Sequence, residues 1–149
     1  MDGFWTLHKK YGKLHWKELW KPSIALSRYG FVVSEFMAGA IAKYADYFQS
    51  HKKDWAFLFD DETGALFVEG GIMRRPQYAK TLKTISSKNG LEKFYHGRIA
   101  KSLVAVAKKG GGIITLDDFK QYRTLENDTI RTNALDREFI TCPSPCRHV

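Results

Sequence analysis

The chain has 149 residues and a mass of 17.1 kDa, which suits one ordinary domain or a part of a larger one. Its 44% of hydrophobic residues excludes wholesale disorder, and its longest apolar stretch, Leu103 to Ala107, is far shorter than a membrane span. The net charge of +8 comes from scattered basic doublets without an aromatic RNA-binding signature, which favours a solvated basic surface over a specific nucleic-acid site.

Apolar residues at three- and four-residue steps predict two helices in the first third of the chain. The first spans Trp16 to Tyr29, and Pro22 is expected to start a fresh turn or to kink it, because proline lacks the donor that a helix interior needs. The second spans Ser34 to Lys53, with Ser34 as its N-cap. Its apolar stripe consists of Met37, Ala40, Ile41, Tyr44 and Phe48.

Short apolar runs predict strands in two places. Residues 56–59 and 65–68 flank the turn-rich cluster Asp60 to Gly64 and are interpreted as a hairpin. Near the C-terminus, Thr129 to Thr132 and Glu138 to Cys142 are further candidate strands. The chain contains no internal repeat, low-complexity stretch or linker, so residues 1–149 are treated as a single region.

Two more helices are predicted after the hairpin. One spans Pro76 to Lys88, with Pro76 at the first helical position and Asn89–Gly90 as its stop signal. The other spans about Gly97 to Lys109. The two apolar stripes are Tyr78, Leu82 and Ile85 on the first helix, and Ile99, Leu103, Val106 and Ala107 on the second.

The stretch KKGGGIITLDDFKQY has two interpretations: a loop that holds a phosphate, or one helix end followed by one helix start. A phosphate loop requires GxxxxGK[ST], or GxGxxG after a strand, and neither spacing is present. Gly110 to Gly112 are therefore predicted to end a helix, and Thr115 to cap a new one through a short-armed capping box with Asp118. Phe119 and Tyr122 on the new helix are expected to face the core.

No other polar cluster has the spacing of a catalytic or metal site. Asp60 to Glu62 lacks the alternating ligands of a calcium loop, and Ser144 lacks the glycine-flanked elbow of a nucleophile. Cys142, Cys146 and His148 supply only three of the four ligands typical of structural zinc, so free thiols on a tail are preferred. No catalytic, cofactor-binding or metal residue is therefore assigned, and the redox compartment stays open. The histidines, which show no HExxH spacing, are His8, His15, His51, His96 and His148.

Two long stretches resemble the γ-glutamyltransferases, the glutathione hydrolases. HKKYGKLHWKELWKPSIALSRYGFVV is similar to the family's large-subunit pattern YGxLxWxxLxxPxIxLxxxGFxV, and the stretch from Arg74 to Tyr122 is similar to its second signature. The final TCPSPC resembles the proline-rich turn that follows. The first pattern is matched by Tyr11, Gly12, Leu14, Trp16, Leu19, Pro22, Ile24, Leu26, Gly30, Phe31 and Val33. The second is matched by Pro76, Ala79, Thr81, Leu82, Ile85, Gly90, Phe94, Tyr95, Gly97, Ile99, Ala100, Gly111, Gly112, Thr115, Asp118 and Tyr122.

The resemblance implies an α+β, mostly helical fragment of the αββα N-terminal-nucleophile hydrolase fold. In that family a precursor cleaves itself, and the new N-terminal threonine of the small subunit attacks the γ-glutamyl bond of glutathione, with its own amine as base. The γ-glutamyl group then passes to water, amino acids or peptides. None of the family's catalytic or substrate-binding residues can be carried onto a position here. The matching Gly30, Gly90 and Gly97 are interpreted as residues at helix ends, and Trp16, Phe94 and Tyr95 as core residues.

Three departures separate the chain from the family pattern. His15 stands where proline is usual, Arg75 where glutamine often precedes the proline, and Cys146–Arg147–His148 where a small, Ser-Gly-rich stretch is expected. By the resemblance the region is incomplete at both ends: it begins after the family's carboxylate-binding arginine and ends before the threonine nucleophile. The isolated chain is therefore expected to be an inactive segment, with the small subunit of the same precursor as its partner. The resemblance implies the extracellular face of the cell, either membrane-anchored or secreted, whereas Met1 to Gly3 lead into no signal-peptide pattern. The alternative is a small basic helical module that binds a protein or nucleic acid and has kept only the scaffold.

Overall fold

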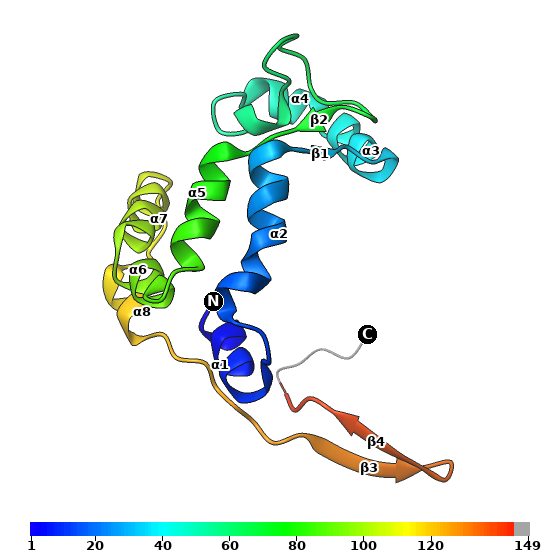
Figure 1. Ribbon diagram of the computed structural model, residues 1–149, viewed down its shortest axis with the longest axis vertical. Coiled ribbons are helices and arrows are strands. Elements are labelled where there is room, and N and C mark those ends of the chain that lie inside the picture. Colours follow the sequence, from blue (N-terminus) through cyan, green and yellow to red (C-terminus); the bar gives the residue numbers. More distant parts are fainter. Residues whose placement is uncertain (145–149) are drawn as a thin grey trace.

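The computed structural model describes residues 1–144, and Figure 1 shows their arrangement. Helices α2 and α5 lie side by side at the centre; one small α/β unit joins one end of this pair, and further helices join the other. No helix among the described residues is long and apolar enough to cross a membrane. The elements are α1 (Asp2–Tyr11), α2 (Trp16–Tyr29), β1 (Phe31–Val32), α3 (Glu35–Lys43), α4 (Ala45–Ser50), the 3-10 helix η1 (Ala56–Leu58), β2 (Ile72–Met73), α5 (Pro76–Ile85), α6 (Gly90–Tyr95), α7 (Arg98–Lys109), α8 (Leu116–Gln121), β3 (Ile130–Ala134) and β4 (Arg137–Thr141).

The best-buried core lies in the α/β unit. Strand β1 pairs antiparallel with β2, and Val33 just after β1 exchanges backbone hydrogen bonds with the turn at Gly70 and Gly71. Val33 and Met73 are fully buried, and burial of apolar surface on this scale is the main stabilising contribution to such a unit. The core cluster consists of Val33, Ile41, Leu58, Phe59, Phe67 and Met73.

The central helix α5 forms the second packing layer. Its buried side chains Ala79, Leu82 and Ile85 recur at three-residue steps. Leu82 and Ile85 belong to the predicted apolar stripe of this helix. The Trp16 indole of α2 donates to the Ile85 carbonyl at 3.3 Å, which fixes one helix against the other. The Trp16 ring also makes an edge contact with Trp5 at a centroid distance of 5.2 Å, and so holds α1 on α2.

The two N-terminal helix predictions are confirmed in position and corrected in detail. Ser34 caps α3, since its hydroxyl accepts from the Met37 amide at 3.3 Å. The helix predicted over Ser34 to Lys53 is divided at Tyr44 into α3 and α4, and it ends at Ser50. Helix α2 runs through Pro22 without a break, so the expected fresh turn at this proline is wrong. Helix α1 was not predicted, because it has no side-chain cap.

The chain reverses direction around residues 60–64, but it does not form the predicted β-hairpin. The residues expected to form its first strand form η1 and its cap, and only an isolated bridge joins Phe59 to Leu66. The turn itself is confirmed: the Asp60 carboxylate accepts from the amides of Glu62 at 3.0 Å and Thr63 at 2.8 Å. Asp60 is used to close a turn, as expected of these residues.

Glycines determine how α5, α6 and α7 follow one another. Helix α5 ends at Ile85, and Gly90 begins α6, so the prediction that Asn89–Gly90 stops one long helix is wrong. A side chain at Gly90 would overlap the Ile85 backbone, so only glycine fits this close approach. Helix α7 matches its predicted span, but it buries Ala100 and Val104 and leaves Leu103 and Val106 largely exposed.

The C-terminal hairpin is exposed on both faces. Its strands β3 and β4 pair in register from Ile130 opposite Thr141 to Ala134 opposite Arg137, close to the predicted strands. Leu135 and Asp136 form the turn, and their φ angles of 51° and 58° are those of a type I′ hairpin turn. Every residue of β3 is exposed, so this hairpin adds almost nothing to the core of the described chain.

The accessible surface is unusually large for the mass. The chain exposes 12093 Å², whereas a compact monomer of 17.1 kDa exposes about 7,800 Å². The excess includes large apolar side chains such as Phe36, 88% exposed, and Ile113, 95% exposed. The arrangement in Figure 1 is correspondingly open, with the β3–β4 hairpin away from the helices α3 to α7.

Candidate functional site

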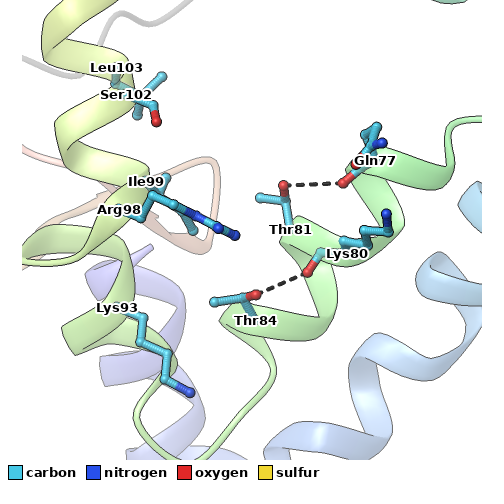
Figure 2. Close-up of a pocket in the computed structure, with 9 residues that line it drawn as sticks. All are labelled: Gln77, Lys80, Thr81, Thr84, Lys93, Arg98, Ile99, Ser102 and Leu103. Atoms are coloured by element: carbon cyan, nitrogen blue, oxygen red, sulfur yellow. Dashed lines mark hydrogen bonds between the residues drawn. The ribbon is translucent and has the colours of Figure 1, made fainter.

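The candidate site is a groove of about 750 Å³ between α5 and the helices α6 and α7. Figure 2 shows that α5 supplies one wall and that α7 faces it. The wall formed by α5 is polar, because the side chains that line the groove there include the Thr81 and Thr84 hydroxyls and the Gln77 amide. The lining residues are Gln77, Lys80, Thr81 and Thr84 from α5, Lys93 from α6, and Arg98, Ile99, Ser102 and Leu103 from α7.

The charge of the groove is entirely positive. Lys80, Lys93 and Arg98 come from three different helices, and no aspartate or glutamate lines the groove. The Arg98 guanidinium extends from α7 toward the hydroxyls of Thr81 and Thr84 on α5 (Figure 2). These side chains give the surface around the groove a positive potential.

The hydroxyl groups of α5 are already used as donors. Thr81 Oγ1 donates to the Gln77 carbonyl at 3.3 Å, and Thr84 Oγ1 donates to the Lys80 carbonyl at 3.0 Å (Figure 2). Lys93 Nζ donates one hydrogen bond to Ser87 Oγ at 3.2 Å, which leaves its other protons for a ligand. The donors that remain for an anion are therefore chiefly the cationic groups.

Ile99 and Leu103 give one side of the groove an apolar surface. Leu103 is 47% exposed although it lies on the apolar stripe of α7. The groove thus combines cationic donors with an adjoining hydrocarbon surface. It contains no cysteine, histidine or carboxylate that could act as a nucleophile or base.

The glycine stretch Gly110 to Gly112 forms the end of a helix, as predicted, and not a phosphate-binding loop. Gly112 N donates to the Ala107 carbonyl at 2.7 Å and Gly111 N to the Lys108 carbonyl at 3.1 Å, the two bonds of a Schellman motif. Gly111 has a φ of 79°, the left-handed conformation that the motif requires. The backbone amides of Gly111 and Gly112 thus satisfy helix carbonyls.

Thr115 begins α8 with the predicted capping box. The Asp118 amide donates to Thr115 Oγ1 at 3.3 Å, and the Asp118 carboxylate accepts from the Thr115 amide at 2.7 Å. The hydrogen bonds from Thr115, the hydroxyl first and then the amide, lower the pKa of Asp118. Phe119 is half-buried against Phe94, whereas Tyr122 lies at the C-cap, stacks on Tyr95 at 5.5 Å and stays 51% exposed.

The described histidines lie apart and serve local structure. His8 Nε2 hydrogen-bonds the Leu14 carbonyl at 2.8 Å, and His15 is the N-cap of α2. His51 and His96 end α4 and α6. Among residues 1–144, no group of three or more His, Cys, Asp or Glu side chains is placed to hold a metal ion.

The cysteine prediction needs a correction. Cys142 forms a disulfide, so the expectation of a free thiol there is wrong. Cys146 and His148 lie outside the described residues. Ser144 is an exposed turn residue that follows the last strand. The α5–α7 groove has no signal in the local sequence, because its lining residues are spread over positions 77–103 and share one groove only when α5 packs beside α6 and α7.

A family model described as Gamma-glutamyltranspeptidase matches residues 1–148 of the chain. The chain belongs to this family. It is 38% identical over 145 residues to glutathione hydrolase proenzyme 1 of Schizosaccharomyces pombe, covering 97% of this chain and 22% of that protein. It is 33% identical over 144 residues to glutathione hydrolase 3 of Arabidopsis thaliana, with 96% and 22% covered. The chain therefore spans about a fifth of the length of these curated relatives.

Solved structures of γ-glutamyltranspeptidases have the same fold. The Helicobacter pylori enzyme superposes with a TM-score of 0.84 at 26% identity, covering 94% of this chain and 40% of that one. The Pseudomonas nitroreducens enzyme, solved with L-DON, superposes with a TM-score of 0.82 at 30% identity, covering 97% and 41%. The described helices and strands thus occur in larger γ-glutamyltranspeptidase chains, which supports the N-terminal-nucleophile fold class.

Family membership explains several matched residues as structural ones. Gly30 ends α2 with a φ of 107°, and Gly97 is the N-cap of α7, where a side chain would overlap the Lys93 backbone. Trp16, Phe94 and Tyr95 are half-buried in aromatic contacts rather than fully buried. These five matched residues therefore serve packing and helix termini.

Proposed function

We propose that this chain is the helical region in the middle of the large subunit of a γ-glutamyltransferase that hydrolyses glutathione. The observation that carries the proposal is the match of residues 1–148 to the γ-glutamyltranspeptidase family. The glutathione hydrolases among the relatives support glutathione as the substrate of the complete protein.

The chain's role in that protein is to support the catalytic parts. The reaction opens the amide between the γ-carboxyl carbon of glutamate and cysteine, and a threonine hydroxyl supplied by the small subunit is the nucleophile. The γ-glutamyl ester formed on this threonine is then transferred to water, an amino acid or a peptide. The described residues contribute helices and turns that hold the large subunit in shape, and no catalytic residue is assigned to them.

The exposed apolar surface supports this assignment. Two apolar grooves of about 490 and 640 Å³ lie along α3, and the exposed residues Phe36 and Val68 adjoin them. The β3–β4 hairpin exposes Phe139 and Ile140 as well. Contiguous apolar patches of this kind are typical of surfaces that are buried against another part of a protein. We assign them to contacts with the remaining large subunit and the small subunit.

The disulfide at Cys142 supports an extracellular location for the complete protein. Disulfides persist in oxidising compartments and are rare in the cytosol. The location therefore agrees with the one that the resemblance implies.

A chimera tests the proposed function. This chain would replace the 145 aligned residues of the S. pombe glutathione hydrolase proenzyme 1. We expect the chimera to cleave itself into two subunits on a gel and to release glutamate from glutathione. The isolated chain, assayed beside a buffer blank, should release none. A soluble chimera that neither matures nor hydrolyses glutathione, or an isolated chain that does, would contradict the proposal.

A further inference from the structure

We propose that Asn127 is the acceptor of an N-linked oligosaccharide. The proposal rests on the extracellular location proposed above, because this modification is added in the secretory pathway. It does not depend on the γ-glutamyl chemistry, and it goes beyond the scaffold role assigned to this region.

The sequence carries the acceptor pattern once. Asn127, Asp128 and Thr129 form N-x-[ST] with a residue other than proline at the centre. The other two asparagines, Asn89 and Asn133, are each followed two positions later by a leucine. A pattern this short also arises by chance, so its structural context decides whether it can be used.

The context is an exposed, irregular segment. Residues 123–129 belong to no helix or strand, and Asn127, Asp128 and Thr129 are all exposed. Figure 1 shows this segment as an extended trace between α8 and the β3–β4 hairpin. Among residues 1–144, neither the Asn127 side-chain amide nor the Thr129 hydroxyl bonds another group. A surface loop of this kind is where a bulky, hydrated oligosaccharide is accommodated.

The segment is held on both sides of the acceptor. Just before it, Glu126 forms an ion pair with Lys10 of α1. Just after it, Ile130 begins β3 and pairs with Thr141 of β4. Asn127 lies between these two attachments, and a group added to its side chain displaces no contact of the described chain. The oligosaccharide would therefore extend into solvent from the outside of this segment.

The disulfide of Cys142 independently indicates the compartment in which this modification takes place. Disulfides persist in oxidising compartments, and the secretory pathway is one of them. In the hairpin, Thr129 immediately precedes the pair Ile130–Thr141 and Cys142 immediately follows it. Two separate signatures of the secretory pathway thus adjoin the same end of the hairpin.

The transfer requires a lipid-linked oligosaccharide diphosphate as donor and a host oligosaccharyltransferase as catalyst. The Asn127 side-chain nitrogen attacks the anomeric carbon of the terminal sugar, and a carbon–nitrogen bond forms as the carbon–oxygen bond to the diphosphate breaks. The lipid diphosphate leaves with the electron pair, and the proton lost by the nitrogen passes to a base of the transferase. The unbonded Thr129 hydroxyl is available for recognition by the transferase, as the pattern requires.

The test secretes the full chain from a yeast behind a cleavable leader. The oligosaccharide is detected on a gel, in the medium and in the microsomal fraction, before and after treatment with a peptide N-glycosidase. We expect one larger species that the enzyme returns to the mobility of chain made in bacteria. Because release converts Asn127 to aspartate, mass spectrometry of that peptide locates the attachment.

Variants separate use of the pattern from other modification. Asn127→Gln and Asp128→Pro should each abolish the larger species, and the second keeps both the asparagine and the threonine. Thr129→Ser should retain it, since serine also fits the pattern. Asn133→Gln, on β3 outside the pattern, is the matched control and should have no effect.

Three outcomes would overturn the proposal: a microsomal chain that the glycosidase does not alter, a larger species that persists in Asn127→Gln, or one that Asn133→Gln abolishes. The chimera described above separates this inference from the proposed function. An active chimera without an oligosaccharide at Asn127 would refute only the modification. A chimera that carries the oligosaccharide but neither matures nor hydrolyses glutathione would contradict only the proposed function.

Discussion

The backbone amide of Thr124 donates to the carboxylate of Asp2 at 2.9 Å, across 122 positions of sequence. This bond is the first cause of a lowered pKa at Asp2. The Asp2 amide in turn donates to the Tyr95 hydroxyl at 3.1 Å. The first turn of α1 is thereby attached to both α6 and the segment after α8.

Asp2→Asn tests this attachment through its pH dependence. A carboxylate whose pKa is lowered on folding stabilises the fold above its ordinary pKa of 3.8, and this contribution is lost as pH falls through the lowered value. The variant should therefore melt below the wild type at neutral pH, and the two should converge in acid. Asp128→Asn, in the exposed segment before β3, is the control. A constant gap at every pH would contradict the prediction.

Thr115→Ala removes the N-cap of α8. We expect a loss of about 1 kcal/mol in the free energy of unfolding, the usual cost of losing a threonine cap. Thr115→Ser should keep most of the stability because its hydroxyl can make the same bond, and Thr129→Ala serves as an exposed control. Urea unfolding followed by circular dichroism measures all three. A Thr115→Ala variant as stable as the wild type would show that the cap contributes nothing.

Substitutions of Gly110 and Gly111 test the backbone conformation at the C-terminal end of α7. Gly111 has a φ of 79° with no atom within 4 Å of an added Cβ, so Gly111→Ala should lose about 1 kcal/mol from backbone strain alone. Gly110 has a φ of −87° and ordinary contacts, so Gly110→Ala should be nearly neutral or slightly stabilising. If thermal melts showed Gly110→Ala to be less stable than Gly111→Ala, the conformations assigned to the two glycines would be refuted.

Arg75 connects η1 to α5 through stacking. Its guanidinium carbon lies 4.1 Å from the Phe57 ring centroid and 4.6 Å from that of Tyr78. Arg75→Gln should cost about 1 kcal/mol because two cation–π contacts are lost. Arg75→Lys should recover part of this loss. Double-mutant cycles with Phe57→Leu would show zero coupling if the stack were not stabilising.

The sequence predicted the features that depend on neighbouring residues. Ser34, Pro76, Gly111 and Thr115 act within one helical turn, through a cap, a fixed φ or a left-handed glycine. Each therefore has a signature in the local sequence that does not need the rest of the fold.

The features missed by the sequence analysis depend on distant partners. Helix α1 has no cap of its own and is held by Trp16 and Thr124. Strands β1 and β2 are two residues each and arise from pairing across 40 positions, so no alternation could indicate them. Leu103 lies on a predicted core stripe but remains half exposed, because the described chain packs α7 through Ala100 and Val104.

The candidate groove was beyond local prediction for the same reason. Lys80, Lys93 and Arg98 are separated in sequence and have no motif among them. One weak signal was present in the sequence. Lys80 and Arg98 adjoin Thr81 and Ile99, which match the family's second signature, and they have no acidic neighbour on the same helix face. Such a signal is weak, since solvated basic faces are common.

The large exposed surface determines how this chain responds to denaturants. The unfolded chain exposes about 24,800 Å², so folding to 12093 Å² buries roughly half of it, compared with about 70% for a compact protein of this length. Both the denaturant m-value and the heat-capacity change scale with the area released on unfolding. We therefore expect each to be about three quarters of the value usual for 149 residues, so that the isolated chain unfolds over a broad range of urea concentration and temperature.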